Sequence, residues 1–255
     1  MTGDSADASN GLAKRVNDRQ RLRFNELWRT SRSLPLSPDR IRFHVWRRYL
    51  VPPIVELGAG DGLLSRTFPS ERIVSVDQAI MGLYDAPEPR IAGTLEHLPI
   101  QAGIARTIVA AEVLEHTGDP LAALAECRRI ARLDARLLLS VPTLPLAPAE
   151  ALYHRLRINE WPSASNLALW DPEHERRYRL DGLMTQLAQT AWEPVEIVPL
   201  FGTATTALLY FGEPIMQRLT GRRFQLAHYG AWLDRRWARF DRQSDVAVIC
   251  RPSRS

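Results

Sequence analysis

The sequence has 255 residues, of which 45% are hydrophobic and 24% charged, a composition typical of a globular chain with a sizeable core. Its two cysteines, Cys127 and Cys250, lie far apart, which excludes a disulfide scaffold and a C-x-x-C metal site. The first residues lack the apolar segment of a secretory signal, and no uncharged run reaches the ~20 residues of a membrane-spanning helix. We therefore expect a cytoplasmic protein.

The formal net charge of +4 is unevenly distributed along the chain. Residues 14–48 carry eleven Lys or Arg against three acids, and residues 218–255 carry nine against three, so the middle of the chain is acidic. Basic segments can attract an anionic partner such as nucleic acid or a membrane surface, or they can be solvated helix faces. Because no base-stacking motif accompanies the charge, we do not expect nucleic acid as a partner, and peripheral membrane contact stays open.

The N-terminal part of the chain is expected to form helices. Residues 1–13 are polar and indicate a disordered tail. Apolar positions within residues 15–30 indicate a first helix, and Ser37-Pro38 is a typical start for a second helix that runs to about Leu50. Residues 14–50 are therefore predicted to be an N-terminal helical cap.

Strand-like and helix-like segments then alternate. Short apolar runs typical of buried strands occupy residues 53–57, 72–77, 90–93, 106–111 and 135–141. The segments between them have helical character at residues 61–68, 78–84 and 119–133. This alternation predicts a doubly wound, Rossmann-like α/β domain over residues 51–255, with parallel strands joined by right-handed crossovers.

The remainder of this domain adds insertions and further strands. Prolines and aromatic residues gather in residues 142–172, which we expect to be one insertion, and residues 200–243 are expected to be a second, helical one. A helix at 175–191 and strands at 195–199 and 245–250 complete the expected pattern. The result is a seven-stranded mixed sheet whose last strand is antiparallel.

A glycine-rich loop, Val-Glu-Leu-Gly-Ala-Gly-Asp-Gly at residues 55–62, follows the first predicted strand. Glycines there let backbone N–H groups approach a ligand without interference from Cβ atoms. A dinucleotide-binding G-x-G-x-x-G loop would need glycine at position 63, where Leu63 stands, so an NAD-dependent oxidoreductase is the weaker alternative. Asp77 ends the second predicted strand, where a carboxylate can accept both hydroxyls of a ribose.

The E-x-G-x-G-x-G loop and Asp77, together with Leu98-Pro99 and Glu112-Val-Leu-Glu-His116, resemble the class I S-adenosylmethionine-dependent methyltransferases. Within that class the sequence is most similar to the small-molecule branch called type 11. The resemblance covers residues 51–199 and the last strand. It implies S-adenosylmethionine as cofactor and a small molecule as methyl acceptor.

The resemblance also implies which residues hold the cofactor. These are Glu56, Gly58, Ala59, Gly60 and Ala111 around the methionine moiety, Asp77 at the ribose, and Gln78, Thr94 and Leu95 around the adenine. Family members usually carry Asp at the position of Thr94, so we expect the adenine to be held here by the hydroxyl alone or more weakly.

Methyl transfer from a sulfonium depends mainly on how the acceptor is positioned. A hydroxyl acceptor must also lose a proton, and histidine is the usual base near neutral pH, so His116 is predicted to be catalytic, the alternative being a local structural role. Glu112, Glu115 and His116 are ligand types that suit a divalent cation. Three near-adjacent residues rarely converge on one ion, and no metal site is predicted.

Three residues are candidates for the acceptor pocket. Tyr153 and Trp170 lie in the first insertion, where aromatic side chains can bind an apolar or planar acceptor or simply pack on the core. His174 belongs to a segment similar to a family pattern near the acceptor, although the same residues also suit a helix N-terminus. We therefore expect a methyltransferase acting on a small molecule at oxygen; the alternative is a non-catalytic S-adenosylmethionine-binding or anion-docking module.

Overall fold

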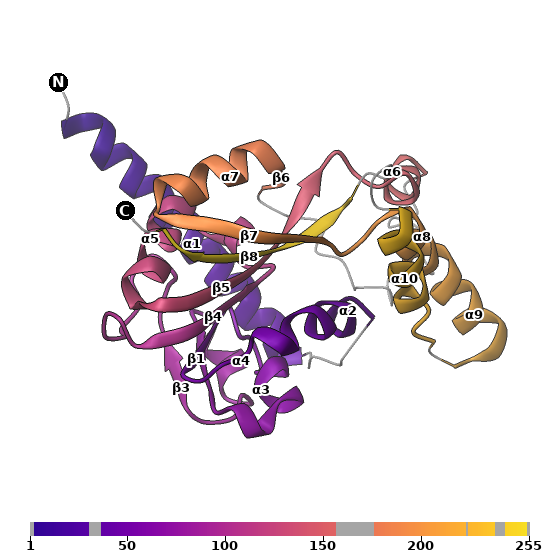
Figure 1. The fold of residues 1–255 in the computed structure, drawn as a ribbon, viewed down its shortest axis with the longest axis horizontal. Helices are drawn as coiled ribbons and strands as arrows, with labels where there is room; N and C mark the ends of the chain where they lie inside the picture. Colours follow the sequence, from indigo (N-terminus) through magenta and orange to yellow (C-terminus); the bar gives the residue numbers. More distant parts are fainter. Residues whose placement is uncertain (1–2, 31–36, 157–175, 223, 238–242, 254–255) are drawn as a thin grey trace.

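The computed structural model describes residues 3–30, 37–156, 176–222, 224–237 and 243–253 (Figure 1). Seven strands pair side by side in the order β3-β2-β1-β4-β5-β8-β7. Their bounds are β1 (Ile54–Leu57), β2 (Ile73–Asp77), β3 (Arg90–Ala92), β4 (Ala105–Ala111), β5 (Ala131–Leu144), β7 (Trp192–Pro199) and β8 (Asp245–Pro252). Strands β1 to β5 are mutually parallel, whereas β8 runs antiparallel to both β5 and β7. The predicted Rossmann-like mixed sheet with an antiparallel last strand is confirmed.

Helices pack on both faces of this sheet. Their bounds are α1 (Gly3–Thr30), α2 (Ser37–Trp46), α3 (Leu63–Thr67), α4 (Ile80–Leu83), α5 (Pro120–Ile130), α6 (Pro148–Arg155), α7 (Leu180–Gln189), α8 (Thr203–Ala207), α9 (Glu213–Thr220) and α10 (Ala227–Trp237). A π-helical turn, Leu208–Gly212, joins α8 to α9. In Figure 1, helices α8, α9 and α10 form a lobe at the end of the molecule away from α1.

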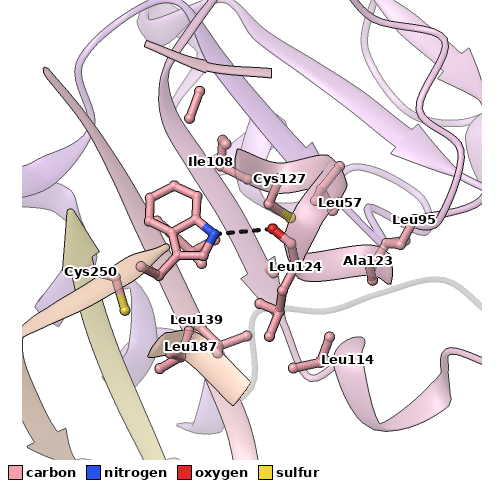
Figure 2. Close-up of a cluster of buried hydrophobic side chains, with 14 of the residues drawn as sticks. Leu57, Leu95, Ile108, Leu114, Ala123, Leu124, Cys127, Leu139, Leu187 and Cys250 are labelled. Carbon is pink, nitrogen blue, oxygen red and sulfur yellow. Dashed lines mark hydrogen bonds between the residues drawn. The ribbon is translucent and has the colours of Figure 1, made fainter. Parts of the chain in front are cut away.

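Alternating strand residues supply two separate hydrophobic cores, because successive side chains of a strand point to opposite faces of the sheet. Along β5, Leu137 and Leu139 belong to the first core and Leu138 to the second. In the first core the Trp192 indole N–H donates to the Leu124 carbonyl, 3.1 Å away (Figure 2). Covering both faces explains why the central strands are apolar at nearly every position.

The structure differs from the sequence-based expectation at several element ends. Residues 3–13, expected to be part of a disordered tail, are the first turns of α1. The helix expected at 119–133 ends at Ile130, where β5 begins.

The segment expected to be one helix at 175–191 is divided. A two-residue strand, β6 (Tyr178–Arg179), pairs parallel with the end of β5, and α7 starts only after it. Most of the first insertion, residues 157–172, lies outside the described residues, and its described part contains α6. Among the described residues no helix combines the length and apolarity needed to cross a membrane.

Helix α1 crosses the edge of the sheet at which β1, β2 and β4 end. The Asn17 side-chain oxygen accepts the Gly118 N–H (2.8 Å), and the Asn25 side-chain oxygen accepts the Met81 N–H (2.9 Å). Ligands of open α/β sheets bind at the carboxyl ends of the strands, at the point where the strand order reverses. The cap helix α1 therefore lies over the expected ligand-binding edge.

Candidate active site

A cavity lies beneath α1 at the carboxyl ends of β1, β2 and β4. Its lining residues come from α1 and from the loops that follow these strands: Asn17, Phe24, Trp28, Gly58, Gly60, Asp77, Gln78, Leu95, Glu96, Glu112, Val113, His116 and Thr117. Glycine, carboxylate, imidazole and aromatic groups thus meet in one place.

The glycine loop is shaped so that only glycine fits at two of its positions. Gly58 and Gly60 have φ angles of +67° and +52°, in the left-handed region that favours glycine. A Cβ atom on Gly58 would lie 2.3 Å from the Val113 side chain, and one on Gly60 would lie 2.5 Å from the Trp28 ring. The loop backbone can therefore approach a ligand closely, with Trp28 of α1 packed against it.

Asp77 fixes this loop to the end of β2. Its carboxylate accepts the Gly60 N–H and the Ala79 N–H, each at 2.7 Å. Burial raises the pKa of Asp77, while these backbone hydrogen bonds act in the opposite direction. Asp77 therefore combines a structural role in the loop with a place on the cavity wall.

Glu56 lies on β1 directly behind the glycine loop and is buried. Burial, reinforced by the negative charges of Asp77 and Asp61, raises the pKa of Glu56 to about 8. The carboxyl is therefore largely protonated at pH 7. A positive charge brought close to it would favour the ionised form.

Glu112, which lines the cavity, belongs to a cluster of carboxylates around one buried arginine. The Glu112 carboxylate accepts a hydrogen bond from the Ser140 hydroxyl (2.8 Å) and lies 3.5 Å from the guanidinium of Arg42. Arg42, on α2, also contacts Asp39 (3.3 Å) and Asp245 (3.2 Å). Burial alone would lower the pKa of Arg42, but these three carboxylates outweigh it and raise that pKa. Arg42 therefore stays charged and holds Glu112 in place.

His116 is buried at the end of a short 3₁₀ turn, Leu114–His116, and lines the cavity. Its ring packs edge-on against Phe24 of α1, with centroids 5.3 Å apart. Its Nε2 lies 4.0 Å from the carboxylate of Glu115, whose pKa is raised well above the usual range, first by burial and then by the charge of Glu112. The imidazole is therefore held in one position on the cavity wall.

Six of the residues predicted from the sequence line this cavity: Gly58, Gly60, Asp77, Gln78, Leu95 and His116. Four others, Glu56, Ala59, Thr94 and Ala111, do not line it, and their cofactor roles stay predictions. Thr94 forms an isolated bridge with His97. Ala111 packs against the second core.

The predicted acceptor residues are not gathered at the cavity. Tyr153, on α6, is buried and packs on Tyr210, with ring centroids 4.6 Å apart. Trp170 and His174 lie outside the described residues. Within the described part of the chain, no three His, Cys, Asp or Glu side chains are grouped so as to hold a metal ion.

Sequence reasoning missed the contribution of α1. Asn17, Phe24 and Trp28 are spaced by seven and four residues, which puts them on one helix face, and all three line the cavity. Glu96, also missed, accepts the N–H groups of Gly118 (3.0 Å) and Asp119 (3.2 Å). The helical spacing could have indicated a shared face, although not what that face covers.

Residues 55–139 match a family model described as a methyltransferase domain, type 11. The matched segment, about a third of the chain, is similar to that family of methyltransferase domains. The matched segment contains the glycine loop, Asp77 and His116, whereas the part of the cavity wall that α1 contributes lies outside it. No curated protein matches the sequence.

Solved structures share the fold of this chain at low sequence identity. A methyltransferase from Archaeoglobus fulgidus is 13% identical, with a TM-score of 0.56, covering 90% of this chain and 98% of its own. Geranyl diphosphate C-methyltransferase from Streptomyces coelicolor, in a complex that contains S-adenosyl-L-homocysteine, is 15% identical, with a TM-score of 0.52 and coverages of 84% and 77%. The [4+2]-cyclase SpnF is 13% identical, with a TM-score of 0.54 and coverages of 84% and 80%.

Proposed function

We propose that this protein is an S-adenosylmethionine-dependent methyltransferase that transfers the methyl group to an oxygen atom of a small molecule, with His116 as the base. The observation that carries the proposal is that His116 and Asp77 line one cavity together with the glycine loop. A base and a ribose-binding carboxylate on the same cavity wall suit a nucleoside cofactor placed next to a hydroxyl acceptor.

The residues of the cavity fit the cofactor. Gly58 and Gly60 line the cavity with backbone alone, and the Asp77 carboxylate at the end of β2 is the group that would bind the ribose hydroxyls. Glu112 offers a negative charge for the positively charged methionine moiety. When bound, the cofactor supplies an electrophilic methyl group on a sulfonium.

The chain's own contribution to the reaction is positioning and proton removal. The cavity wall would hold the acceptor hydroxyl against the methyl group that the bound cofactor would supply, and the sulfur would keep the electron pair of the carbon–sulfur bond as a neutral thioether. The hydroxyl proton goes to the imidazole of His116, whose ring orientation is maintained by Phe24. General-base help of this kind is worth about 10²- to 10⁴-fold in rate.

The acceptor class is inferred from the cavity and from the type 11 resemblance. The similar structures include a geranyl diphosphate C-methyltransferase and a cyclase, so the fold alone does not determine the acceptor. We assign Trp170 and His174 to the acceptor side, with Tyr153 supporting it through its packing on Tyr210. A cytoplasmic location fits this role.

Calorimetry with S-adenosylhomocysteine tests the cofactor site. Asp77→Asn replaces a carboxylate that accepts two N–H groups by an amide with a single acceptor oxygen, and it removes the charge expected at the ribose. We expect an affinity loss of about 10- to 100-fold, equivalent to one charge-assisted hydrogen bond. Asp134→Asn, at an exposed acid paired with Arg132, is the matched control and should bind normally.

Turnover with a panel of hydroxyl, amine and carbon acceptors, followed by mass spectrometry, tests the reaction. His116→Gln should lower kcat by at least about 10²-fold while leaving affinity for S-adenosylhomocysteine within a few-fold. Unchanged kcat in this variant would remove the base role, and methyl transfer only to nitrogen or carbon would overturn the oxygen assignment. Tight cofactor binding with no turnover on any acceptor would favour the non-catalytic alternative.

A further inference from the structure

The hairpin of α9 and α10 exposes large apolar side chains. Leu219 on α9 is 75% exposed, and Tyr229 and Trp232 on α10 are 61% and 55% exposed. Ile215 is exposed one turn before Leu219. Both helices belong to the lobe at the end of the molecule away from α1 (Figure 1). Such side chains are costly in water unless another surface covers them.

The exposed charge on the same hairpin is entirely positive. The two acidic residues of its described part, Glu213 and Asp234, accept hydrogen bonds from backbone N–H groups inside the lobe. Glu213 accepts the Ala227 N–H (2.9 Å) at the start of α10, and buried Asp234 accepts the N–H groups of Ala204 (2.9 Å) and Thr205 (2.8 Å) in α8. The exposed charged residues that remain in the described part of the hairpin are Arg218, Arg222, Arg235 and Arg236.

The packing of α10 against α8 determines which of its faces is exposed. A Cβ atom on Gly230 would lie 2.5 Å from the backbone of Thr205, so α10 approaches α8 closely at this point. Asp234, one turn later, faces α8 as well. Trp232 therefore lies on the outer side of α10, and the Arg236 guanidinium lies over its ring, 5.4 Å from the centroid.

A groove of about 700 Å³ runs between the outer side of α10 and α2. Its floor is apolar, formed by the buried residues Ile41 and Ala231, and its walls carry Tyr229 and Trp232. Arginine and histidine side chains supply the polar part of its lining, and no acid lines it. The volume falls in the range of ligand sites, about 300–1,000 Å³. An apolar floor with cationic edges suits an amphiphile with an anionic head.

We propose that the outer side of the α9–α10 hairpin, with the α2–α10 groove, docks on an anionic phospholipid bilayer. The groove takes a lipid phosphate together with part of its acyl chain. Tyr229 and Trp232 lie at the level of the headgroups, which amphipathic aromatic rings prefer. The arginines lie on the anionic surface, which attracts basic side chains close to it.

Single-stranded nucleic acid also binds to arginines interleaved with aromatic rings. Ile215 and Leu219 distinguish the two partners, because exposed aliphatic side chains offer no stacking surface to bases but gain free energy by entering an acyl layer. The hairpin is therefore better suited to lipid than to nucleic acid.

Co-sedimentation with vesicles tests the proposal on the full-length protein. We expect binding to phosphatidylcholine vesicles that contain phosphatidylglycerol, weak binding to phosphatidylcholine alone, and release by high salt. Trp232→Ala combined with Arg235→Gln should weaken binding to the anionic vesicles by about tenfold or more, since both an interfacial ring and a basic residue are lost.

The matched control replaces an exposed apolar and basic pair elsewhere, Leu133→Ala with Arg132→Gln; Leu133 is 87% exposed in β5. This control should bind vesicles normally. Thermal unfolding and affinity for S-adenosylhomocysteine should be unchanged in both double variants, which separates docking from folding and from the cofactor site. Equal binding to neutral and anionic vesicles, or normal binding by the Trp232 double variant, would overturn the proposal. So would binding of a single-stranded oligonucleotide or inorganic phosphate without any vesicle binding.

Discussion

The carboxyl group of Glu56 is a buried acid whose protonation differs between the folded and unfolded chain. Its pKa in the folded protein is about 8, raised first by burial and then by Asp77 and Asp61, against an ordinary value of 4.5. Between these two pH values the folded state retains a proton that the unfolded state has released. The contribution of Glu56 to stability is therefore complete below pH 4.5 and is lost as the pH rises through 8.

Replacing Glu56 by Gln removes this titration while keeping the side-chain shape. We expect the melting temperature of Glu56→Gln, relative to that of the wild type, to increase by several degrees between pH 5 and pH 8.5. Thermal unfolding followed by circular dichroism across this range measures the difference. Glu88→Gln, at an exposed acid paired with Arg90, should show no such trend. A difference that stays constant with pH would contradict the raised pKa.

At the scale of a single element, α1 restricts the space available to the cofactor. The cavity beneath it holds about 170 Å³, which is smaller than the roughly 300–1,000 Å³ of typical ligand sites. Trp28 packs on Gly60, and Asn17 bonds to Gly118, so part of the site is filled by α1 itself. We therefore expect α1 to move away from the sheet edge when the cofactor enters.

A reversible cross-link between α1 and α4 tests this motion. Because the Asn25 side chain reaches the Met81 backbone N–H, cysteines at these two positions are placed to form a disulfide. In Asn25→Cys with Met81→Cys, oxidation should slow association of S-adenosylhomocysteine by about tenfold or more, and reduction should restore it. Stopped-flow fluorescence measures both rates. Identical rates in the two redox states would mean that the cofactor enters without movement of α1.

Some helices and strands could be predicted from the sequence, whereas others could not. Buried parallel strands are continuous apolar runs and the glycine loop has a recognisable spacing, so the sheet and the place of Asp77 at the end of β2 could be predicted. β6 is two residues long, too short for any periodicity, and the sequence predicts a helix at its position. The face of α1 formed by Asn17, Phe24 and Trp28 has helical spacing, but spacing does not say which surface it covers. Only the fold places that face over the glycine loop.

At the scale of the whole molecule, one guanidinium connects the helical cap to the end of the chain. Arg42 of α2 contacts Glu112, which follows β4. It also contacts Asp245, the first residue of β8, although Arg42 and Asp245 are 203 residues apart in the sequence. These groups are buried or partly buried, and the pKa of Asp245 is raised, mainly by burial and then by the charge of Glu112. Removing one partner of such a cluster leaves charges that neither water nor a counter-ion compensates.

Arg42→Ala should therefore lower the free energy of unfolding by about 3–5 kcal/mol near neutral pH. The loss should shrink as the pH falls, because Asp245, whose pKa is raised, then becomes protonated and no longer needs the guanidinium. Urea unfolding at pH 5.5 and pH 8 measures both effects. Arg48→Ala is the matched control, since Arg48 pairs with Glu196 at the surface (2.6 Å) and solvent screens that pair, so little change is expected. If Arg42→Ala were no less stable than Arg48→Ala, or if its loss did not depend on pH, the cap would be held to the sheet by apolar packing around Trp46 and not by this charge cluster.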